Sequence, residues 1–298
     1  MSVEGQGEGP AAALDRAVAS ASPRLRVLGE LTLLWLLTLG AIRLVVALQP
    51  AIPAVGFSGL TLRDAVLALV PFLFIYTPVW LCEFRRRDSA AYGLYIPAFS
   101  DVSAWGAAAR HAGWLALLIL VPWLVGYHLY QNGVLAFVEA AGPIRSAADF
   151  TRSVERLWSG ELDLFATRSA WSVFTETRFP AFRWPADAAL LVPYHVFFVA
   201  IPEEFFYRGY FQARLNEVFP TRWKVFGTWV GPGLLVAAVF FAFGHSLVTL
   251  RWWHFATFFP GLLFGWLRER TGSTLPGALF HAWCNVCVSL LDASYGVR

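Results

Sequence analysis

The feature that most constrains this chain is a series of apolar segments that are long enough to cross a bilayer. A membrane-spanning helix needs about 20 mainly apolar residues, and the segment from Val27 to Leu48 already reaches this length. The whole chain is 57% hydrophobic and only 14% charged, whereas a soluble domain carries about 25% charged residues. The sequence therefore predicts an all-α fold, a polytopic transmembrane helical bundle.

We expect about seven to eight spans. Their approximate bounds are 27–48, 64–82, 113–130, 187–219, 226–250, 255–267 and 276–291. A helix break at Pro193 or Pro202 would raise the number from seven to eight. The arginine triplet 85–87 follows the second span, and the positive-inside rule places it in the cytoplasm. Because the first two spans then form a hairpin, the N-terminus is expected to be cytoplasmic too.

Composition divides the chain into four parts. Residues 1–22 are rich in Gly, Ala, Ser and charge and predict a disordered cytosolic tail, and residues 23–130 hold the N-terminal transmembrane helices. Residues 131–187 carry mixed charges and predict a non-cytoplasmic cap or loop, and residues 188–298 form the helical core with the candidate site. The cap is either a lid that controls substrate access or an insertion without a catalytic role, and we prefer the second interpretation. The net charge of +3 comes from scattered basic residues and indicates no nucleic-acid partner.

Two adjacent carboxylates, Glu203 and Glu204, lie at the end of an almost wholly apolar run. On insertion scales a charge at the centre of a bilayer costs about 2.5–3.5 kcal/mol. Residues four apart share a helix face, so Glu204 can pair with Arg208. Glu203 lies about 100° round the helix from Glu204 and lacks that partner. Either the segment ends at the membrane surface and both acids are solvated, or Glu203 faces a polar site.

Three further polar residues lie in later apolar segments. They are His245, His281 and Asn285, and the last two are four residues apart on one helix face. Polar groups in lipid need polar partners, so one shared cluster with the glutamates is preferred over separate structural hydrogen bonds. A carboxylate beside imidazoles can take a proton from water, while imidazole and amide groups can donate to a developing oxyanion. Such a cluster is sufficient for amide hydrolysis by an activated water.

These residues resemble the three signatures of the CPBP intramembrane proteases, the family of the CAAX prenyl endopeptidase Rce1 and the bacterial Abi proteins. The resemblance covers roughly the last third of the chain. The motifs, in order, are Glu203-Glu204-x-x-x-Arg208, Phe241-x-x-x-His245 and His281-x-x-x-Asn285.

The resemblance implies a role for each motif residue. Glu203 corresponds to the general base that activates water, with help from His245. His281 and Asn285 correspond to the residues that stabilise the oxyanion. The supporting residues are Glu204, Arg208 and Phe241. Simple topology places Glu203 and His245 toward opposite membrane faces, which conflicts with their expected proximity in one cluster.

The resemblance implies an enzyme that uses no cofactor. A zinc-dependent version of the same hydrolysis is an alternative, in which Glu203, His245 and His281 would bind the metal. The sequence has no HExxH motif, and we prefer the metal-free interpretation. Two other functions stay open: a proton-coupled membrane transporter and a non-catalytic binding protein.

The expected substrate is a membrane-anchored protein in the lipid bilayer, cleaved in or near a membrane segment, in particular a C-terminal segment. Short loops and a compact chain favour a multi-pass protein of a bacterial inner membrane. Because bacteria do not generally make farnesylated CAAX proteins, a prenylated substrate is doubtful. A myxosortase-like role, in which the enzyme processes C-terminal sorting helices of exported proteins, is the alternative that the resemblance offers.

Overall fold

A computed structural model describes most of the chain outside its N-terminal tail and the middle of the predicted cap. The described ranges are 22–52, 56–57, 60–134, 147–159, 182–185 and 188–296. Nearly all of the tail predicted at 1–22, and most of the cap predicted at 131–187, lie outside the described residues. The chain divides into two compact units, one of residues 1–112 and 189–284 and the other of residues 113–188 and 285–298.

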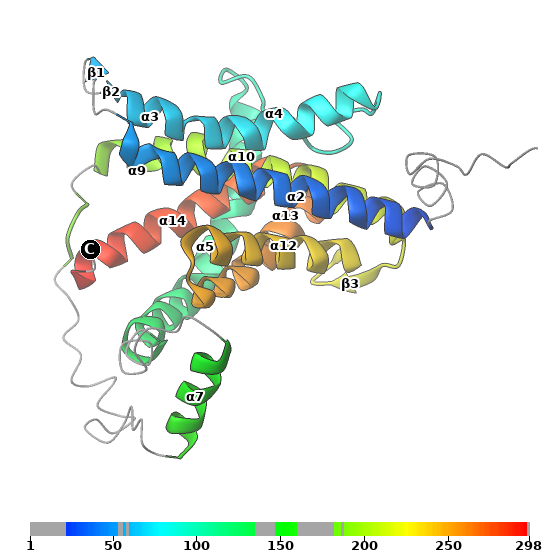
Figure 1. The fold of residues 1–298 in the computed structure, drawn as a ribbon. Helices are drawn as coiled ribbons and strands as arrows, with labels where there is room; N and C mark the ends of the chain where they lie inside the picture. The colour runs from blue at the N-terminus through cyan, green and yellow to red at the C-terminus, as the bar shows by residue number, and fades with distance from the viewer. Residues whose placement is uncertain are drawn as a thin grey trace, which may run out of the picture. The chain divides into compact units, whose positions relative to one another are not determined.

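The described residues are almost entirely helical, which confirms the predicted fold class (Figure 1). The α-helices are α2 (Pro23–Leu48), α3 (Leu62–Leu67), α4 (Leu69–Phe84), α5 (Val102–Leu129), α7 (Ala147–Trp158), α9 (Ala188–Tyr194), α10 (Ile201–Glu204), α11 (Ala213–Val218), α12 (Pro232–Thr249), α13 (Phe258–Thr271) and α14 (Leu275–Tyr295). Two short segments are 3-10 helices, η1 (Gln49–Ala51) and η5 (Trp252–Thr257). Three segments are π-helical, η2 (Tyr130–Val134), η3 (His195–Ala200) and η4 (Phe205–Gln212). Two antiparallel hairpins complete the fold: β1 (Gly56–Phe57) with β2 (Leu60–Thr61), and β3 (Trp223–Val225) with β4 (Thr228–Val230).

Within the described residues, five helices are long and apolar enough to cross a membrane. They are Pro23–Ala51, Leu62–Phe84, Val102–Asn132, Ala188–Val218 and Pro232–Thr249. The predicted spans at 255–267 and 276–291 are helical, as α13 and α14, but they are not among these five, so the predicted count of seven to eight is not confirmed.

Two predicted boundaries were wrong. The span expected from 226 begins at Pro232, because residues 223–230 pair as the β3–β4 hairpin. The span expected from 113 begins at Val102, since small residues such as Ala107 and Ala108 extend the helix toward its N-terminus.

Local signals explain where several helices begin and end. The Ser22 hydroxyl accepts a hydrogen bond from the Leu25 N–H, and Pro23 follows in the first helical position of α2, where its missing N–H is harmless. A capping box between Thr61 and Asp64 starts α3. Gly272 ends α13 in the left-handed region, at φ +71°, which glycine adopts without steric cost.

In the first unit, α12 packs against α2, α13 and η4 (Figure 1). Two polar side chains of α2 reach carbonyl groups of α12. The Trp35 indole donates to the Phe240 carbonyl at 3.1 Å, and the Arg43 guanidinium donates to the Val248 carbonyl at 2.9 Å. These bonds satisfy groups that would be costly to leave unpaired in an apolar environment, and they fix α2 alongside α12.

Charged residues at the ends of several helices gather at one end of the first unit. Glu30 of α2 accepts hydrogen bonds from Tyr210 at 2.7 Å, from Arg85 at 3.0 Å and from Arg214 at 3.2 Å. These contacts bring the arginines after α4 and the C-terminal part of the central helix to the same end of this unit. Which side of the membrane this is stays a prediction.

The same end of the first unit includes Tyr92, whose hydroxyl donates to Glu217. Arg87 contacts both of these side chains. Burial raises the pKa of the Tyr92 phenol to about 12, and the hydrogen bond to the Glu217 carboxylate raises the pKa further because it favours the neutral phenol. Tyr92 is therefore a neutral donor throughout the physiological pH range.

The second unit contains the later part of α5 and the end of α14. Tyr127 of α5 donates to Asp292 of α14, and the Tyr295 hydroxyl lies 2.9 Å from Nδ1 of His128. The Arg183 backbone N–H donates to the Ser294 hydroxyl at 3.1 Å. These bonds fix the end of α14 within this unit.

Candidate active site

The helix that carries the two glutamates is continuous from Ala188 to Val218 but changes its pitch around them. The α-helical turn α10 holds Glu203 and Glu204 and lies between the π-helical segments η3 and η4. Pro202 lacks an N–H and interrupts the regular hydrogen-bond pattern. The break expected at Pro193 or Pro202 is thus replaced by widened turns, of a kind frequently found at functional sites.

Glu204 forms a buried ion pair with Arg208. Its Oε1 accepts from the guanidinium at 2.9 Å, and the side chains are 0% and 1% exposed. The pair expected from the four-residue spacing is therefore present, and both partners are inside the bundle. The interpretation in which both acids are solvated is wrong for Glu204.

Aromatic rings and a carbonyl surround the Arg208 guanidinium. It donates to the Gly261 carbonyl at 3.1 Å. The guanidinium carbon lies 4.2 Å from the centre of the Phe241 ring and 5.0 Å from that of Phe264. Cation–π contacts of this kind are strongest where the cation is desolvated. They help explain how the bundle tolerates a buried arginine.

The contact between the central helix and α13 repeats every four residues. Gln212, four residues after Arg208, donates to the Gly265 carbonyl at 3.0 Å, just as Arg208 donates to the Gly261 carbonyl. A Cβ added to Gly261 would lie 3.1 Å from the Arg208 guanidinium, and one added to Gly265 would lie 2.7 Å from the Gln212 amide oxygen. A side chain at either position would require the neighbouring side chains to shift. The Gly-x-x-x-Gly spacing, typical of close helix packing in membranes, was the sequence signal for it.

Glu203 faces two imidazoles. Its Oε2 lies 3.8 Å from Nε2 of His245 and 3.9 Å from Nε2 of His281. The structure thus brings together three of the four residues predicted to be catalytic, from three different helices. Glu203 lies near the middle of its long helix, which resolves the expected conflict of depth with His245.

The hydrogen bonds of the two histidines determine what each ring offers to Glu203. Nδ1 of His245 lies 3.0 Å from the Phe241 carbonyl, which only accepts, so this nitrogen carries the proton. Nδ1 of His281 lies 3.1 Å from Oε1 of Glu204, which is paired with Arg208 and therefore ionised. Nε2 of His245 is then an acceptor in the neutral imidazole, while Nε2 of His281 accepts in the neutral ring and donates in the imidazolium.

Two acceptors, Nε2 of His245 and Oε2 of Glu203, therefore lie close together beside Nε2 of His281. Within the described residues, Oε2 of Glu203 is buried and has no hydrogen-bond partner. A water molecule can bridge two polar atoms that lie more than 3.5 Å apart. A water molecule has the two donors that this arrangement requires.

Aromatic rings fix both histidines. Phe264 stacks on His281, with ring centres 4.6 Å apart and planes inclined by 14°. Phe241 lies 4.4 Å from His245 and 5.7 Å from His281, centre to centre. Phe241 is therefore in contact with both imidazoles and with Arg208. Sequence reasoning missed Phe264, which has no distinguishing spacing.

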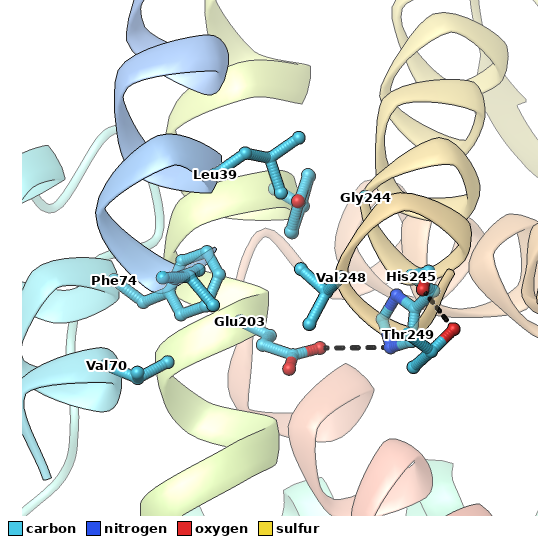
Figure 2. Close-up of a pocket in the computed structure, with 10 residues that line it drawn as sticks. Leu39, Val70, Phe74, Glu203, Gly244, His245, Val248 and Thr249 are labelled. Atoms are coloured by element: carbon cyan, nitrogen blue, oxygen red, sulfur yellow. Dashed lines mark hydrogen bonds and ion pairs between the residues drawn. The ribbon is translucent and has the colours of Figure 1, made fainter. Parts of the chain in front are cut away.

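A pocket of about 110 Å³ adjoins Glu203 and His245 (Figure 2). Figure 2 shows the Glu203 carboxylate and the His245 ring pointing toward one another at one side of it. The residues that line it are Leu39, Ile42, Val70, Phe74, Glu203, Tyr207, Gly244, His245, Val248 and Thr249. Sequence reasoning missed the residues from α2 and α4, because apolar side chains that face a pocket look like those that face lipid.

Asn285, the fourth residue predicted to be catalytic, follows His281 by four residues in α14. It belongs to the second compact unit, whereas Glu203, His245 and His281 belong to the first. Its role in stabilising an oxyanion stays a prediction.

The geometry of Glu203, His245 and His281 does not fit a tetrahedral zinc ion. Zinc bonds of about 2.0–2.2 Å in tetrahedral geometry place ligand atoms roughly 3.3 Å apart, and the separations from Oε2 of Glu203 are 3.8 and 3.9 Å. Across the described parts of the chain, no group of three or more His, Cys, Asp or Glu side chains is placed to hold a metal ion. Catalysis without a metal stays a prediction.

The fold and this cluster define a multi-pass helical membrane protein with a buried carboxylate–imidazole site. Residues 185–287 match the family model described as type II CAAX prenyl endopeptidase Rce1-like. The chain therefore carries an Rce1-like domain of the CPBP protease family, which confirms the resemblance in the motifs. No curated protein matches the chain, and no solved structure matches it.

Proposed function

We propose that the protein is an intramembrane endopeptidase that hydrolyses a peptide bond through a water molecule activated by Glu203 and His245. The observation that carries the proposal is the position of Oε2 of Glu203, which accepts no hydrogen bond from the described residues and lies within 4 Å of Nε2 of His245 and of His281. A water molecule at this point donates to Glu203 and to one imidazole, and its oxygen lone pair remains free to attack a carbonyl carbon.

In the proposed reaction, Glu203 takes a proton as the water oxygen bonds to the carbonyl carbon. The tetrahedral intermediate then collapses, the C–N bond breaks, and the leaving nitrogen receives the proton from Glu203. The products are a new carboxyl terminus and a new amine. His245 positions the water. The hydrogen bond from its Nδ1–H to the Phe241 carbonyl holds the ring in the orientation in which Nε2 accepts a hydrogen bond from the water.

His281 and Asn285 are proposed to stabilise the oxyanion. For His281 this role requires a proton on Nε2, so the ring must be an imidazolium while Nδ1 is bound to Glu204.

The substrate is proposed to be a membrane-anchored protein, cleaved in or near a membrane segment such as a C-terminal one. A bacterial inner membrane with the N-terminus in the cytoplasm is the proposed location. The name of the matched family refers to prenylated CAAX proteins, and a myxosortase-like substrate is the alternative for this chain.

A cleavage assay on a purified single-span substrate in detergent tests the proposal. Glu203→Gln removes the general base and should lower the cleavage rate by about 10²–10⁴-fold relative to the wild type. The matched control is Glu83→Gln, since Glu83 is an exposed glutamate at the end of α4, and it should retain the full rate. A strong chelator should leave the wild-type rate unchanged, whereas inhibition that zinc reverses would favour the metal-dependent alternative.

A proton-coupled transporter is the competing function, because intramembrane Glu and His residues also form proton relays. Protein reconstituted in vesicles would then move protons in a Glu203-dependent way without cleaving peptide bonds. Glu203-dependent proton uptake without any hydrolysis would refute the proposed protease.

A further inference from the structure

The β3–β4 hairpin carries an aromatic side chain in a strained position at its tip. Its two-residue loop, Phe226-Gly227, lies inside the pair Val225–Thr228, and the two loop residues have positive φ, +46° and +80°. Loops of this kind favour Asn-Gly, Asp-Gly or Gly-Gly, because a bulky side chain disfavours the left-handed region. Phe226 is 89% exposed, more than any other large apolar side chain in the described ranges. Packing within the chain therefore does not explain this strain, and backbone strain of this kind often accompanies function.

The two strands place a cation and a second aromatic side chain on one face of the hairpin. Lys224 and Trp229 are directly opposite each other in the register, so their side chains lie on the same face. Both are exposed, and Trp229 is 60% exposed. The other face is buried, since Thr228 is 5% and Val230 is 4% exposed. The outward face and the tip together thus present Lys224, Trp229 and Phe226.

Helix α13 fixes the hairpin in this orientation. The Trp266 indole donates to the Val225 carbonyl at 3.0 Å. The Arg270 guanidinium donates to the Phe226 carbonyl at 3.5 Å and to the Thr228 hydroxyl at 3.4 Å. Strained backbone persists where the surrounding structure determines its position in this way. The hairpin is therefore a fixed part of the first unit, and its exposed face is available to a partner.

The hairpin lies where a membrane surface is expected. It connects the apolar helix that ends at Val218 to the one that begins at Pro232, and β3 lies beside the N-terminal end of α12 (Figure 1). Both helices are long and apolar enough to cross a membrane, so a short connection between them stays near the headgroups. Tryptophan and tyrosine rings are enriched at this level because they have an apolar body and a polar edge.

The charge around the hairpin complements an anionic lipid. Arg222 precedes β3, Lys224 lies within it, and Arg270 contacts the loop. The carboxylate of Glu269, next to Arg270, accepts hydrogen bonds from side chains of the central helix. Lipid phosphate groups attract basic residues of this kind near the membrane surface. A protein partner fits less well, because a specific protein interface buries about 800 Å² on each side, whereas the outward face and tip present three side chains.

We propose that the β3–β4 hairpin is an anchor that binds anionic phospholipids of the surrounding bilayer. Phe226 and Trp229 enter the headgroup region of the leaflet, and Lys224 contacts a lipid phosphate. The left-handed backbone at Phe226 is retained because it places an aromatic ring at the tip. This role is separate from the proposed protease function and does not depend on it.

A lipid titration tests the proposal. The full chain in detergent is titrated with phosphatidylglycerol, which is anionic, or with phosphatidylcholine, which has no net charge, and thermal unfolding is followed. A ligand that binds the folded state raises the melting temperature in a concentration-dependent way. Phosphatidylglycerol should act on the wild type at lower concentrations than phosphatidylcholine. Inorganic phosphate should have no effect, since it offers no headgroup region to the aromatic rings.

Variants of the exposed residues separate the charge from the aromatic tip. Lys224→Gln should weaken the apparent affinity for phosphatidylglycerol about 5-fold, the contribution of one basic residue near an anionic surface. Phe226→Asn should weaken it by at least this factor, because burial of a phenylalanine ring contributes as much or more, and Phe226→Trp should bind like the wild type. Without lipid, Phe226→Asn should melt at the wild-type temperature or above it, since Asn-Gly suits this loop.

The matched control is Arg26→Gln, which removes one positive charge from an exposed position on α2 and should leave the lipid affinity unchanged. Equal losses of affinity in Arg26→Gln and Lys224→Gln would show a general effect of charge and would overturn the proposal. Wild-type lipid affinity in Phe226→Asn would also overturn it, and so would a lower melting temperature of this variant without lipid, which would give Phe226 a structural role. Hairpin variants that bind lipid normally but bind a membrane peptide more weakly would assign this surface to a protein partner instead.

Discussion

Replacing Arg208 by methionine removes one partner of the buried ion pair and leaves Glu204 charged in the bundle. The two side chains are 1% and 0% exposed and 2.9 Å apart. Removing one member of such a pair costs about 3–5 kcal/mol, because the other charge loses its compensation. The variant also loses the hydrogen bond to the Gly261 carbonyl. Methionine roughly retains the volume next to Phe241, so cavity formation adds little.

Thermal unfolding in detergent measures this effect. A loss of 1 kcal/mol lowers the melting temperature of a chain of 150–250 residues by about 2–4 °C, so Arg208→Met should melt about 6–20 °C lower. The matched control is Arg152→Met, which breaks an ion pair with Asp149, three residues earlier on α7. The Arg152 side chain is 68% exposed, and exposed pairs contribute little, so this control should melt like the wild type.

A second variant separates the buried charge from the loss of packing. Glu204→Gln combined with Arg208→Met removes both charges and should recover much of the stability lost by Arg208→Met alone. An unchanged melting temperature for Arg208→Met would contradict the reasoning. A double variant that is less stable than Arg208→Met would contradict it too, since neither charge of the pair remains in the double variant.

Two further predictions concern packing and pH. Gly265→Ala brings a Cβ to 2.7 Å from the Gln212 amide oxygen and should cost about 1–3 kcal/mol by overpacking. Gly40→Ala, where a Cβ meets nothing within 4 Å, should instead stabilise α2 by up to about 1 kcal/mol. Equal melting temperatures for these two variants would refute the close helix contact. Tyr92→Phe removes the hydrogen bond to Glu217 and should cost about 1–3 kcal/mol. The pKa of the Tyr92 phenol is raised to about 12 from an ordinary value of about 10. The stability that this hydrogen bond adds is therefore complete below about pH 10 and is lost as the pH rises through 12. The stability lost in Tyr92→Phe, measured by thermal unfolding, should therefore be equal at about pH 6 and about pH 9. A loss that disappears at about pH 9 would contradict the assignment of Tyr92 as the hydrogen-bond donor.

The sequence was most informative where polar residues interrupt apolar segments. Lipid offers no hydrogen bonds, so buried Glu, His and Arg must meet one another. This argument, with the four-residue spacing of Glu204 and Arg208, predicts that Glu203, His245 and His281 lie in one cluster. The fold class followed from hydropathy alone.

Other features carried no comparable signal. The π-helical turns around Glu203 depend on local hydrogen bonding that hydropathy does not record. The β3–β4 hairpin overlaps the start of the span predicted at 226–250, because Phe226, Trp229 and Val230 are as apolar as the residues of a helix in lipid. For α13 and α14, length and hydropathy alone leave open whether a helix crosses the membrane or packs inside the bundle.

The central claim is that Glu203 and His245 act on the same water molecule. The most direct measurement compares the single-turnover cleavage rates of Glu203→Gln, His245→Gln and the double variant on one membrane peptide. Residues that act as a unit are strongly non-additive, so the double variant should be about as slow as the slower single variant. Rate losses that multiply in the double variant would show two independent contributions and would contradict a shared water.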